Sequence, residues 1–328
     1  MQCSRATGTV GGTVDMSVAV QPEKILRELR ELWDELGRAE ETPGGVLRAC
    51  AMTLLVAAEE QGEAEQVRKT LGVLMHDHPS RAIVLRSQEG SGVEARVFAE
   101  CWMPFGRHQQ ICAEGIEITA GGAELSEVVH VLLPLMVPDL PVVLWCRGGR
   151  AFTDPAIEAL FPLADKIIFD SAAASDAKAA LQLLRSLRAR GRRVADLTWT
   201  RLTGWREVLS QLFDDGVLDP DAVASVRIVH GGSGASTCAL YLTKWIEQGL
   251  PGARVMVESA SDEPGIRAIT LLGGSAEVSI RRTGPSCVEA RAGGRSYRTP
   301  LPPVTEEALM REELSILGPD SVFDRVLA

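Results

Sequence analysis

Residues 230–237, HGGSGAST, place three glycines between a β-prone run and a helical one. Backbone N–H groups of a glycine-rich turn at a helix N-terminus bind phosphate, so Gly231, Gly232, Ser233 and Gly234 are candidate anion-binding residues for a sugar phosphate or a nucleotide. The turn lacks the lysine of a P-loop and the GxGxxG spacing of a dinucleotide site, and Ser233 does not sit in a GxSxG elbow. A tight strand-to-helix turn explains the glycines equally well.

A second candidate is WTRLTGWRE, residues 199–207, which holds two tryptophans and two arginines. Tryptophan and arginine are enriched at the centres of protein interfaces, and arginine pairs bidentately with carboxylate or phosphate. We expect Trp199, Arg201, Trp205 and Arg206 to contact a protein partner. The alternative is that both indoles are core anchors and both guanidiniums are solvated.

The five histidines offer neither a metal site nor a catalytic site in the sequence. His76 and His78 lie two residues apart, whereas a zinc site needs three or four ligands. No histidine has a recognisable serine or cysteine partner nearby, although such partners need not be local in sequence. We therefore assign no catalytic residue, no metal and no cofactor.

The most apolar stretch, residues 132–149, reads LLPLMVPDLPVVLWCRGG. A membrane helix needs about 20 mostly apolar residues, and three prolines and an aspartate interrupt this run. It is better explained as a helix end, a PDLP turn and a buried strand over 142–146. Trp145 and Arg147 would then lie at the carboxyl end of that strand, where open α/β sheets form their binding crevices.

The composition sets limits on partners and compartment. The formal charge of −10 over 328 residues argues against nucleic acid or an anionic membrane as the main partner. Seven scattered cysteines without a CxxC pair indicate reduced thiols in a cytoplasmic protein. Residues 1–21 are predicted to be a disordered tail, and either Met1 or Met16 could be the translation start.

An N-terminal α/β domain is predicted over residues 22–173, with a mostly parallel sheet and flanking helices. Its helices are expected at 22–38, 63–77, 123–136 and 155–163, and its strands at 80–87, 93–102, 111–120, 142–146 and 166–171. The run over 46–57 fits either a strand or a helix.

A C-terminal α/β domain is predicted over residues 174–328. Helices are expected at 176–193, within 194–215, at 236–248 and at 305–317, with a strand at 225–230. From residue 253 the apolar residues alternate with polar ones between glycine and proline turns, which predicts an antiparallel meander.

Several segments together resemble one family, the glucose-6-phosphate dehydrogenase assembly proteins known as OpcA. The resemblance rests on HPSRAIVL (78–85), LPLMVPDLPVVLWCRG (133–148), DPAIEALFPLADKIIFDSA (154–172), DLTWTRLTGWREVLSQLFD (196–214) and REELSILGPDSVFDRVL (311–327). These segments lie in order and cover both predicted domains.

This resemblance implies a non-catalytic accessory protein that binds glucose-6-phosphate dehydrogenase, promotes its active oligomer and so raises NADPH supply through the oxidative pentose phosphate pathway. A small phosphorylated effector is a further expected partner. Photosynthetic members are linked to thioredoxin control, but the sequence has no closely spaced cysteine pair, so this control is not carried over. The alternative function is a sugar-phosphate or nucleotide sensor that uses the 230–237 turn.

Overall fold

The computed structural model of the chain describes residues 7–10, 21–38, 45–58, 63–88, 92–104, 109–121, 127–232, 236–261, 263–274, 276–316 and 318–328. The chain divides into two units, each held together by its own contacts. Unit 1 comprises Met1–Phe169, Arg192–Val194 and Met310–Leu317, and unit 2 comprises Asp170–Gly191, Ala195–Leu309 and Gly318–Ala328. The chain therefore passes between the units several times.

Unit 1 is built on a nine-stranded sheet. Its strands are β1 (Thr7–Val10), β2 (Val46–Arg48), β3 (Met52–Ala58), β4 (Ser80–Gln88), β5 (Val93–Trp102), β6 (Gln110–Gly121), β7 (Val142–Cys146), β8 (Lys166–Phe169) and β9 (Arg193–Asp196). Strands β3 and β7 are buried along their whole length, which explains why 142–146 is continuously apolar and why 52–58 is apolar except for Thr53.

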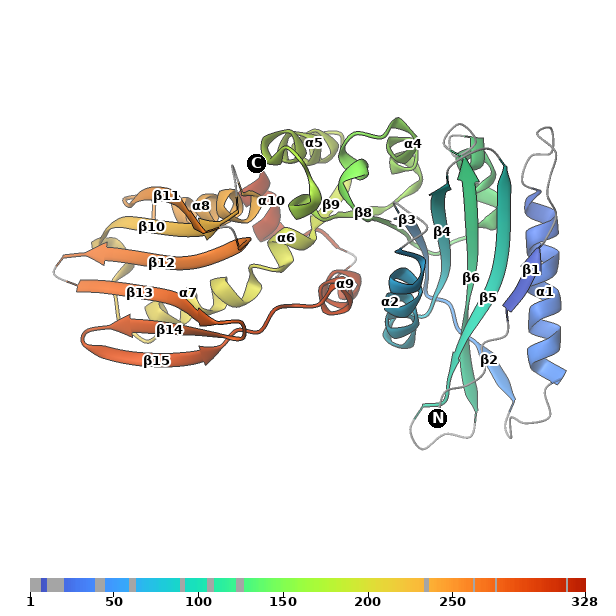
Figure 1. The fold of residues 1–328 in the computed structure, drawn as a ribbon, viewed down its shortest axis with the longest axis horizontal. Coiled ribbons are helices and arrows are strands. Elements are labelled where there is room, and N and C mark those ends of the chain that lie inside the picture. The colour runs from blue at the N-terminus through green and yellow to red at the C-terminus, as the bar shows by residue number, and fades with distance from the viewer. Residues whose placement is uncertain are drawn as a thin grey trace. The chain divides into compact units, whose positions relative to one another are not determined.

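The strand order of this sheet is β1-β5-β6-β4-β3-β7-β8-β9, and β2 pairs with β6 (Figure 1). Strands β6, β4, β3, β7 and β8 run parallel, while β5 runs antiparallel to β6. From β3 the chain continues outward to β4 and later returns to β7 on the other side of β3. The order therefore reverses between β3 and β7, and the run β6-β4-β3-β7-β8-β9 is the 3-2-1-4-5-6 order of dinucleotide-binding sheets.

The helices of unit 1 include α1 (Pro22–Arg38) and α2 (Ala64–Asp77), both as predicted. Helix α1 buries Ile25, Leu29 and Leu32 and packs against β5 and β1. A single-turn helix, α4 (Pro155–Glu158), starts at Asp154, whose carboxylate accepts a hydrogen bond from the Ala156 N–H group. The predicted helix over 155–163 thus ends early and continues as a 3-10 turn at Phe161–Leu163.

A buried carboxylate, Glu114 on β6, connects four elements of unit 1. Its side chain is 1% exposed and accepts hydrogen bonds from Trp33 of α1 at 2.6 Å, Arg48 of β2 at 2.5 Å and Arg81 of β4 at 2.6 Å. Arg81 also donates to the Leu135 carbonyl at 2.8 Å. Because both carboxylate oxygens are occupied by donors, the charge is compensated inside the core.

Two expectations for unit 1 need correction. The predicted helix over 123–136 is α-helical at residues 127–128 and then continues as 3-10 turns at Val129–Val131 and Leu133–Leu135. Pro134 cannot continue an α-helical hydrogen-bond pattern, which accounts for the change. In the predicted disordered tail, residues 7–10 form β1 and pair with β5, and the other residues before Gln21 lie outside the described part of the chain.

The expectation that every cysteine is reduced is also wrong. Cys101 of β5 and Cys112 of β6 form a disulfide, with their Cα atoms 4.1 Å apart. The two residues stand directly opposite each other in the antiparallel register, and this proximity is invisible in the sequence because eleven positions separate them. Cys146 is a buried free thiol, and burial raises the pKa of that thiol.

Unit 2 combines a six-stranded sheet with helices. Its strands are β10 (Val223–Gly231), β11 (Arg254–Ser261), β12 (Gly265–Gly273), β13 (Ala276–Gly284), β14 (Cys287–Ala292) and β15 (Arg295–Pro300). Its helices are α5 (Ala177–Ala189), α6 (Leu197–Thr200), α7 (Thr203–Asp214), α8 (Thr237–Gly249) and α10 (Ser321–Leu327). The helix α9 (Glu306–Ser315) has its first residues in unit 2 and the remainder in unit 1.

The predicted meander holds for β12 to β14, which pair antiparallel in succession, and β15 adds a further antiparallel strand next to β14. Strand β11 is the exception, because it pairs with β10 and runs parallel to it. The β10–α8–β11 segment is therefore a βαβ unit, whose parallel pairing requires a crossover rather than a hairpin. The sequence analysis missed β15 and α10.

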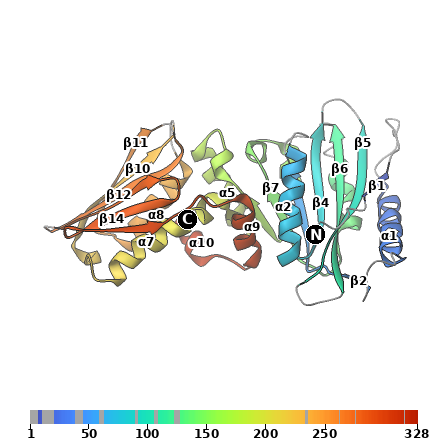
Figure 2. The ribbon, with the colours of Figure 1, turned by 60° about the horizontal axis from the view of Figure 1, so that its bottom comes forward.

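The two faces of this sheet differ in character. Helices α7 and α8 lie on one face (Figures 1 and 2), where Val226, Ile228, Ile269 and Ile280 are buried. Among the described residues no helix covers the other face. The predicted α/β class is therefore confirmed, with one mostly parallel and one mostly antiparallel sheet. Every helix in the described part of the chain is too short or too polar to span a bilayer.

We predict that Glu114→Ala lowers the free energy of unfolding by about 3–5 kcal/mol, because Arg81 would keep its charge inside the core without a carboxylate. Urea unfolding followed by circular dichroism measures the change. Glu94→Ala is the matched control, since it breaks an exposed pair with Arg96 on the same sheet, and we expect little change there. Equal losses for the two variants would contradict the role given to Glu114.

Candidate functional site

The carboxyl ends of β3 and β7 meet at the point where the strand order reverses, which is where sheets of this type bind their ligands. In this chain an ion pair lies there. Arg147, the residue after β7, reaches Glu63 with Nη1 2.6 Å from Oε2, and its backbone N–H donates to the Ala57 carbonyl at 3.0 Å. Glu63 directly precedes α2, so its carboxylate lies at the positive end of the helix dipole, where a phosphate would otherwise bind.

The residues that connect β3 to α2 also disfavour a dinucleotide. The connection from residue 57 reads AAEEQGE, with one glycine and three glutamates. A dinucleotide turn needs three glycines so that its backbone can approach the pyrophosphate closely. Carboxylates at Glu59, Glu60 and Glu63 would repel that anion. Residues 59–62 lie outside the described residues.

The expected crevice at Trp145 and Arg147 is only partly supported by the geometry. Trp145 is 1% exposed and belongs to the core of β7, so its indole lines no surface of unit 1. The cavity nearby, between Ala57, Ala58, Ile157 and Leu160, encloses about 10 Å³, which is at the lower limit for a single water. Arg147 is the one member of the predicted pair that is placed at the strand ends, and it is held by Glu63.

The glycine-rich turn lies at the end of β10. Gly231 is its last residue and is buried, and Gly232 adopts a φ of 98°, which favours glycine. The Gly232 carbonyl accepts a hydrogen bond from the Ser259 hydroxyl at 2.9 Å. Ser233 and Gly234 fall outside the described residues, so anion binding by this turn stays a prediction.

The side chains of His76 and His230 contact neighbouring groups within their own units. The His76 ring lies 4.8 Å from that of Trp102, and His78 ends α2. His230 is buried, with Nδ1 3.2 Å from the Gly231 carbonyl, while His108 lies outside the described residues. Within the part of the chain that the structure describes, no three His, Cys, Asp or Glu side chains gather as a metal site.

The predicted partner-binding tryptophans are core residues. Trp199 and Trp205 are 2% and 4% exposed, and the Trp199 indole donates to Asp320 at 3.1 Å. The Arg206 guanidinium stacks on Trp199, 3.7 Å from the ring centroid. The core alternative therefore describes both indoles correctly, and an arginine beside them serves packing within unit 2. Contact with a partner through Arg201 or Arg206 stays a prediction.

A buried polar cluster that the sequence analysis missed surrounds Asp196 in unit 2. One Asp196 oxygen accepts from the N–H groups of Ser171 at 3.0 Å and Thr198 at 2.9 Å, and the other accepts from the Tyr241 hydroxyl at 2.7 Å. Asp196 thereby joins the end of β9 to the α8 helix. An aspartate directly after a strand and before a short helix was the available signal, because aspartate commonly caps helices.

Asp170 and Arg201 lie at the edge of this cluster. The Arg201 guanidinium binds Asp170 with two hydrogen bonds, of 3.1 and 2.7 Å, and Asp170 also accepts from the Thr198 hydroxyl at 3.0 Å. Burial works to raise the pKa of Asp170, but the hydrogen bonds and charge of Arg201 outweigh it, so the pKa is lowered.

The two aspartates are shifted in opposite directions. Burial, and then the charge of Asp170, raises the pKa of Asp196. Burial and the neighbouring Asp196 raise the pKa of Tyr241 well above its usual range. The cluster therefore holds one ionised carboxylate at its edge and a second carboxyl that resists ionisation in its centre.

We predict that Asp196→Asn gains stability relative to the wild type as pH rises. Only the wild type must ionise a buried carboxyl as pH rises. The free energy of unfolding of the wild type therefore falls between the unfolded-state pKa of Asp196, about 3.9, and its higher folded-state pKa. Urea unfolding of both proteins between about pH 4 and pH 8 measures this difference. A difference that does not change with pH would show that Asp196 ionises as easily in the folded protein as in the unfolded one.

Two family models match the chain in succession. Both describe a subunit of glucose-6-phosphate dehydrogenase: residues 72–186 match its N-terminal domain, and residues 192–327 match its C-terminal domain. Together these matches cover most of the chain, in the order in which the two predicted domains occur.

Known proteins agree with this assignment. The putative OxPP cycle proteins OpcA of Synechocystis sp. and Nostoc punctiforme are 30% and 28% identical to this chain over 142 residues, which is 42% of this chain and 30% of each relative. Among solved structures, a mutant of the 3-ketoreductase KijD10 from Actinomadura kijaniata has a similar fold, with a TM-score of 0.50 and 12% identity over 84% of this chain and 93% of the reductase. The chain belongs to the OpcA family of glucose-6-phosphate dehydrogenase assembly proteins.

Proposed function

We propose that this chain is a non-catalytic accessory protein that binds glucose-6-phosphate dehydrogenase and promotes its active oligomer. The observation that carries the proposal is the match of both successive domains to a subunit of that enzyme. The matched region of 142 residues is 30% of the length of each curated relative, so the relatives extend well beyond it. The activity of the whole relatives is therefore part of the proposal.

The geometry of unit 1 supports the absence of catalysis. The sheet has the strand order of a dinucleotide-binding domain, but the Arg147–Glu63 pair lies where the pyrophosphate would bind. An ion pair at this position disfavours a bound dinucleotide, and with it hydride transfer by this chain. The fold can still present surfaces to another protein, since function depends on the sites that a fold carries.

Activation has a thermodynamic requirement. A protein that binds the active and inactive forms of the enzyme equally well shifts nothing, so this chain must bind the active oligomer more tightly. By reciprocity, substrate that favours the active oligomer must tighten the binding of this chain by the same factor. The proposal therefore predicts coupling in both directions.

We predict that the purified chain co-elutes with glucose-6-phosphate dehydrogenase of the same organism and raises its activity in a saturable manner. Size-exclusion chromatography reports the complex, and NADPH formation reports the activity. The chain alone serves as the blank and should form no NADPH. Absence of a complex, or a complex with unchanged kinetics, would exclude an activating role.

The partner contact proposed for Arg201 can be tested separately. Arg201→Ala should weaken the complex while the protein stays folded, because the side chain of Arg201 is 38% exposed at the edge of its cluster. The control is Arg190→Ala, an exposed arginine in the same unit whose hydrogen bond is to its own helix. Trp205→Ala should instead lower the free energy of unfolding of unit 2 by about 3–5 kcal/mol. Unchanged affinity in a folded Arg201→Ala protein would remove this residue from the interface.

A further inference from the structure

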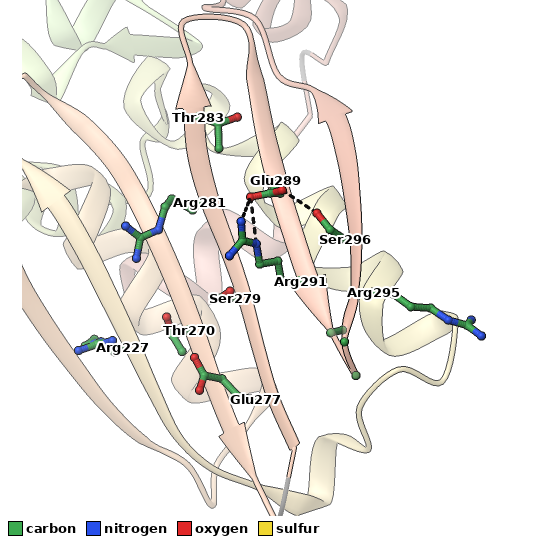
Figure 3. A pocket seen from close by; sticks show the side chains of 13 residues that line it. Arg227, Thr270, Glu277, Ser279, Arg281, Thr283, Glu289, Arg291, Arg295 and Ser296 are labelled. Carbon is green, nitrogen blue, oxygen red and sulfur yellow. Dashed lines mark hydrogen bonds and ion pairs between the residues drawn. The ribbon is translucent and has the colours of Figure 1, made fainter.

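The uncovered face of the six-stranded sheet in unit 2 is polar and hollowed. Alternate residues of each strand point to this face, as the pleat requires, and Figure 3 shows them with the helices behind the sheet. They line a depression of about 900 Å³, here called the sheet hollow. Ligand pockets commonly enclose about 300–1,000 Å³, so its volume suits a small molecule.

The register of the strands explains why the face is hollowed. One cross-strand row reads Arg227 on β10, Thr270 on β12, Ser279 on β13 and Arg291 on β14. Long side chains at both ends and short hydroxyl side chains in the middle leave space above the centre of the row. Arg281 stands two residues further along β13 and adds a third guanidinium to the rim (Figure 3).

The arginines of the rim differ in what they already bind. Arg291 pairs with Glu289 at 2.9 Å, and Glu289 also accepts from the Ser296 hydroxyl at 2.6 Å. Arg227 and Arg281 are exposed, and among the described residues no carboxylate lies within 4.0 Å of either guanidinium. In a chain with a formal charge of −10, two arginines of the same hollow without a bound carboxylate are available for an anionic ligand.

A carboxylate in the same hollow narrows the ligand class. Glu277, near the start of β13, lines the hollow and makes no ion pair within the described residues. A guanidinium fork binds phosphate oxygens bidentately, whereas a carboxylate repels phosphate and accepts hydrogen bonds from hydroxyl groups. Both groups are satisfied by a ligand that carries a phosphate at one end and hydroxyls at the other.

We propose that the sheet hollow binds a small phosphorylated polyol of the sugar-phosphate class. Arg227 and Arg281 bind the phosphate, Thr270 and Ser279 offer hydroxyl groups from the floor, and Glu277 accepts from hydroxyls of the sugar. An acidic protein surface would meet the same arginines, but a concave face with a free carboxylate fits the smaller ligand better. This site does not depend on binding to the dehydrogenase.

Isothermal titration of the full chain with a hexose phosphate, the matching hexose and inorganic phosphate tests the proposal. We expect the hexose phosphate to bind at least tenfold more tightly than either of the others, because only it engages both ends of the hollow. Absence of binding by the hexose phosphate would overturn the proposal. Equal affinity for inorganic phosphate would also overturn it, since it would show an adventitious ion only.

Variants locate the binding. Arg227→Ala combined with Arg281→Ala should weaken hexose phosphate binding at least tenfold, and Glu277→Gln should weaken it several-fold while inorganic phosphate binding stays the same. Arg190→Ala is the matched control and should bind as the wild type does. Circular dichroism confirms folding, which outward-facing substitutions should preserve. A folded double variant that binds hexose phosphate as tightly as the wild type would contradict the assignment. So would a double variant that loses dehydrogenase binding while the wild-type chain binds no sugar phosphate.

Discussion

The meeting of β3 and β7 is the constraint around which unit 1 is arranged. Parallel strands whose connections leave in opposite directions produce a crevice at their carboxyl ends, and in dinucleotide-binding sheets this crevice holds the dinucleotide. Here Arg147 and Glu63 form an ion pair at this crevice, with Nη1 2.6 Å from Oε2. The charged pair uses the helix dipole that a pyrophosphate would use. In unit 1 this position is thus occupied by two of the chain's own side chains.

Unit 2 is organised by buried polar groups on one side of its sheet and exposed ones on the other. Asp196 binds backbone N–H groups of Ser171 and Thr198 and the hydroxyl of Tyr241, which fixes how α8 meets the end of β9. A buried hydrogen-bond network of this kind makes the arrangement of the helices specific. The uncovered face keeps arginines available in the sheet hollow. The two faces therefore separate structural from binding roles.

Patterns within a strand or a helix were predictable from the sequence, and pairings between distant segments were not. The amphipathic spacing of 22–38 and the apolar run over 142–146 predicted α1 and β7. The parallel pairing of β11 with β10 depends on a crossover, and the disulfide between Cys101 and Cys112 depends on register. The strand–helix–strand succession of β10, α8 and β11 was a signal for the parallel pair, but the period-2 alternation after residue 252 favoured a meander. The disulfide left no such pattern.

The same distinction between local patterns and distant pairings applies to the candidate sites. Tryptophan next to arginine suggested an interface, yet the Arg206 guanidinium stacks on the Trp199 ring and completes a packed core. Arg147 was recognised because it follows a buried strand, whereas its partner Glu63 is 84 positions away and was not. The sheet hollow could not be predicted, since its row of side chains comes from four strands whose register only the fold determines.

Coenzyme binding by the isolated chain tests the central claim most directly. Isothermal titration with NADP+ and with NAD+ should show no saturable binding up to about 1 mM ligand, a concentration at which any complex with a micromolar Kd would be saturated. Glucose-6-phosphate dehydrogenase titrated in the same way serves as the positive control. Saturable binding of either dinucleotide to the isolated chain, at micromolar affinity, would contradict the claim that Arg147 and Glu63 close the coenzyme position.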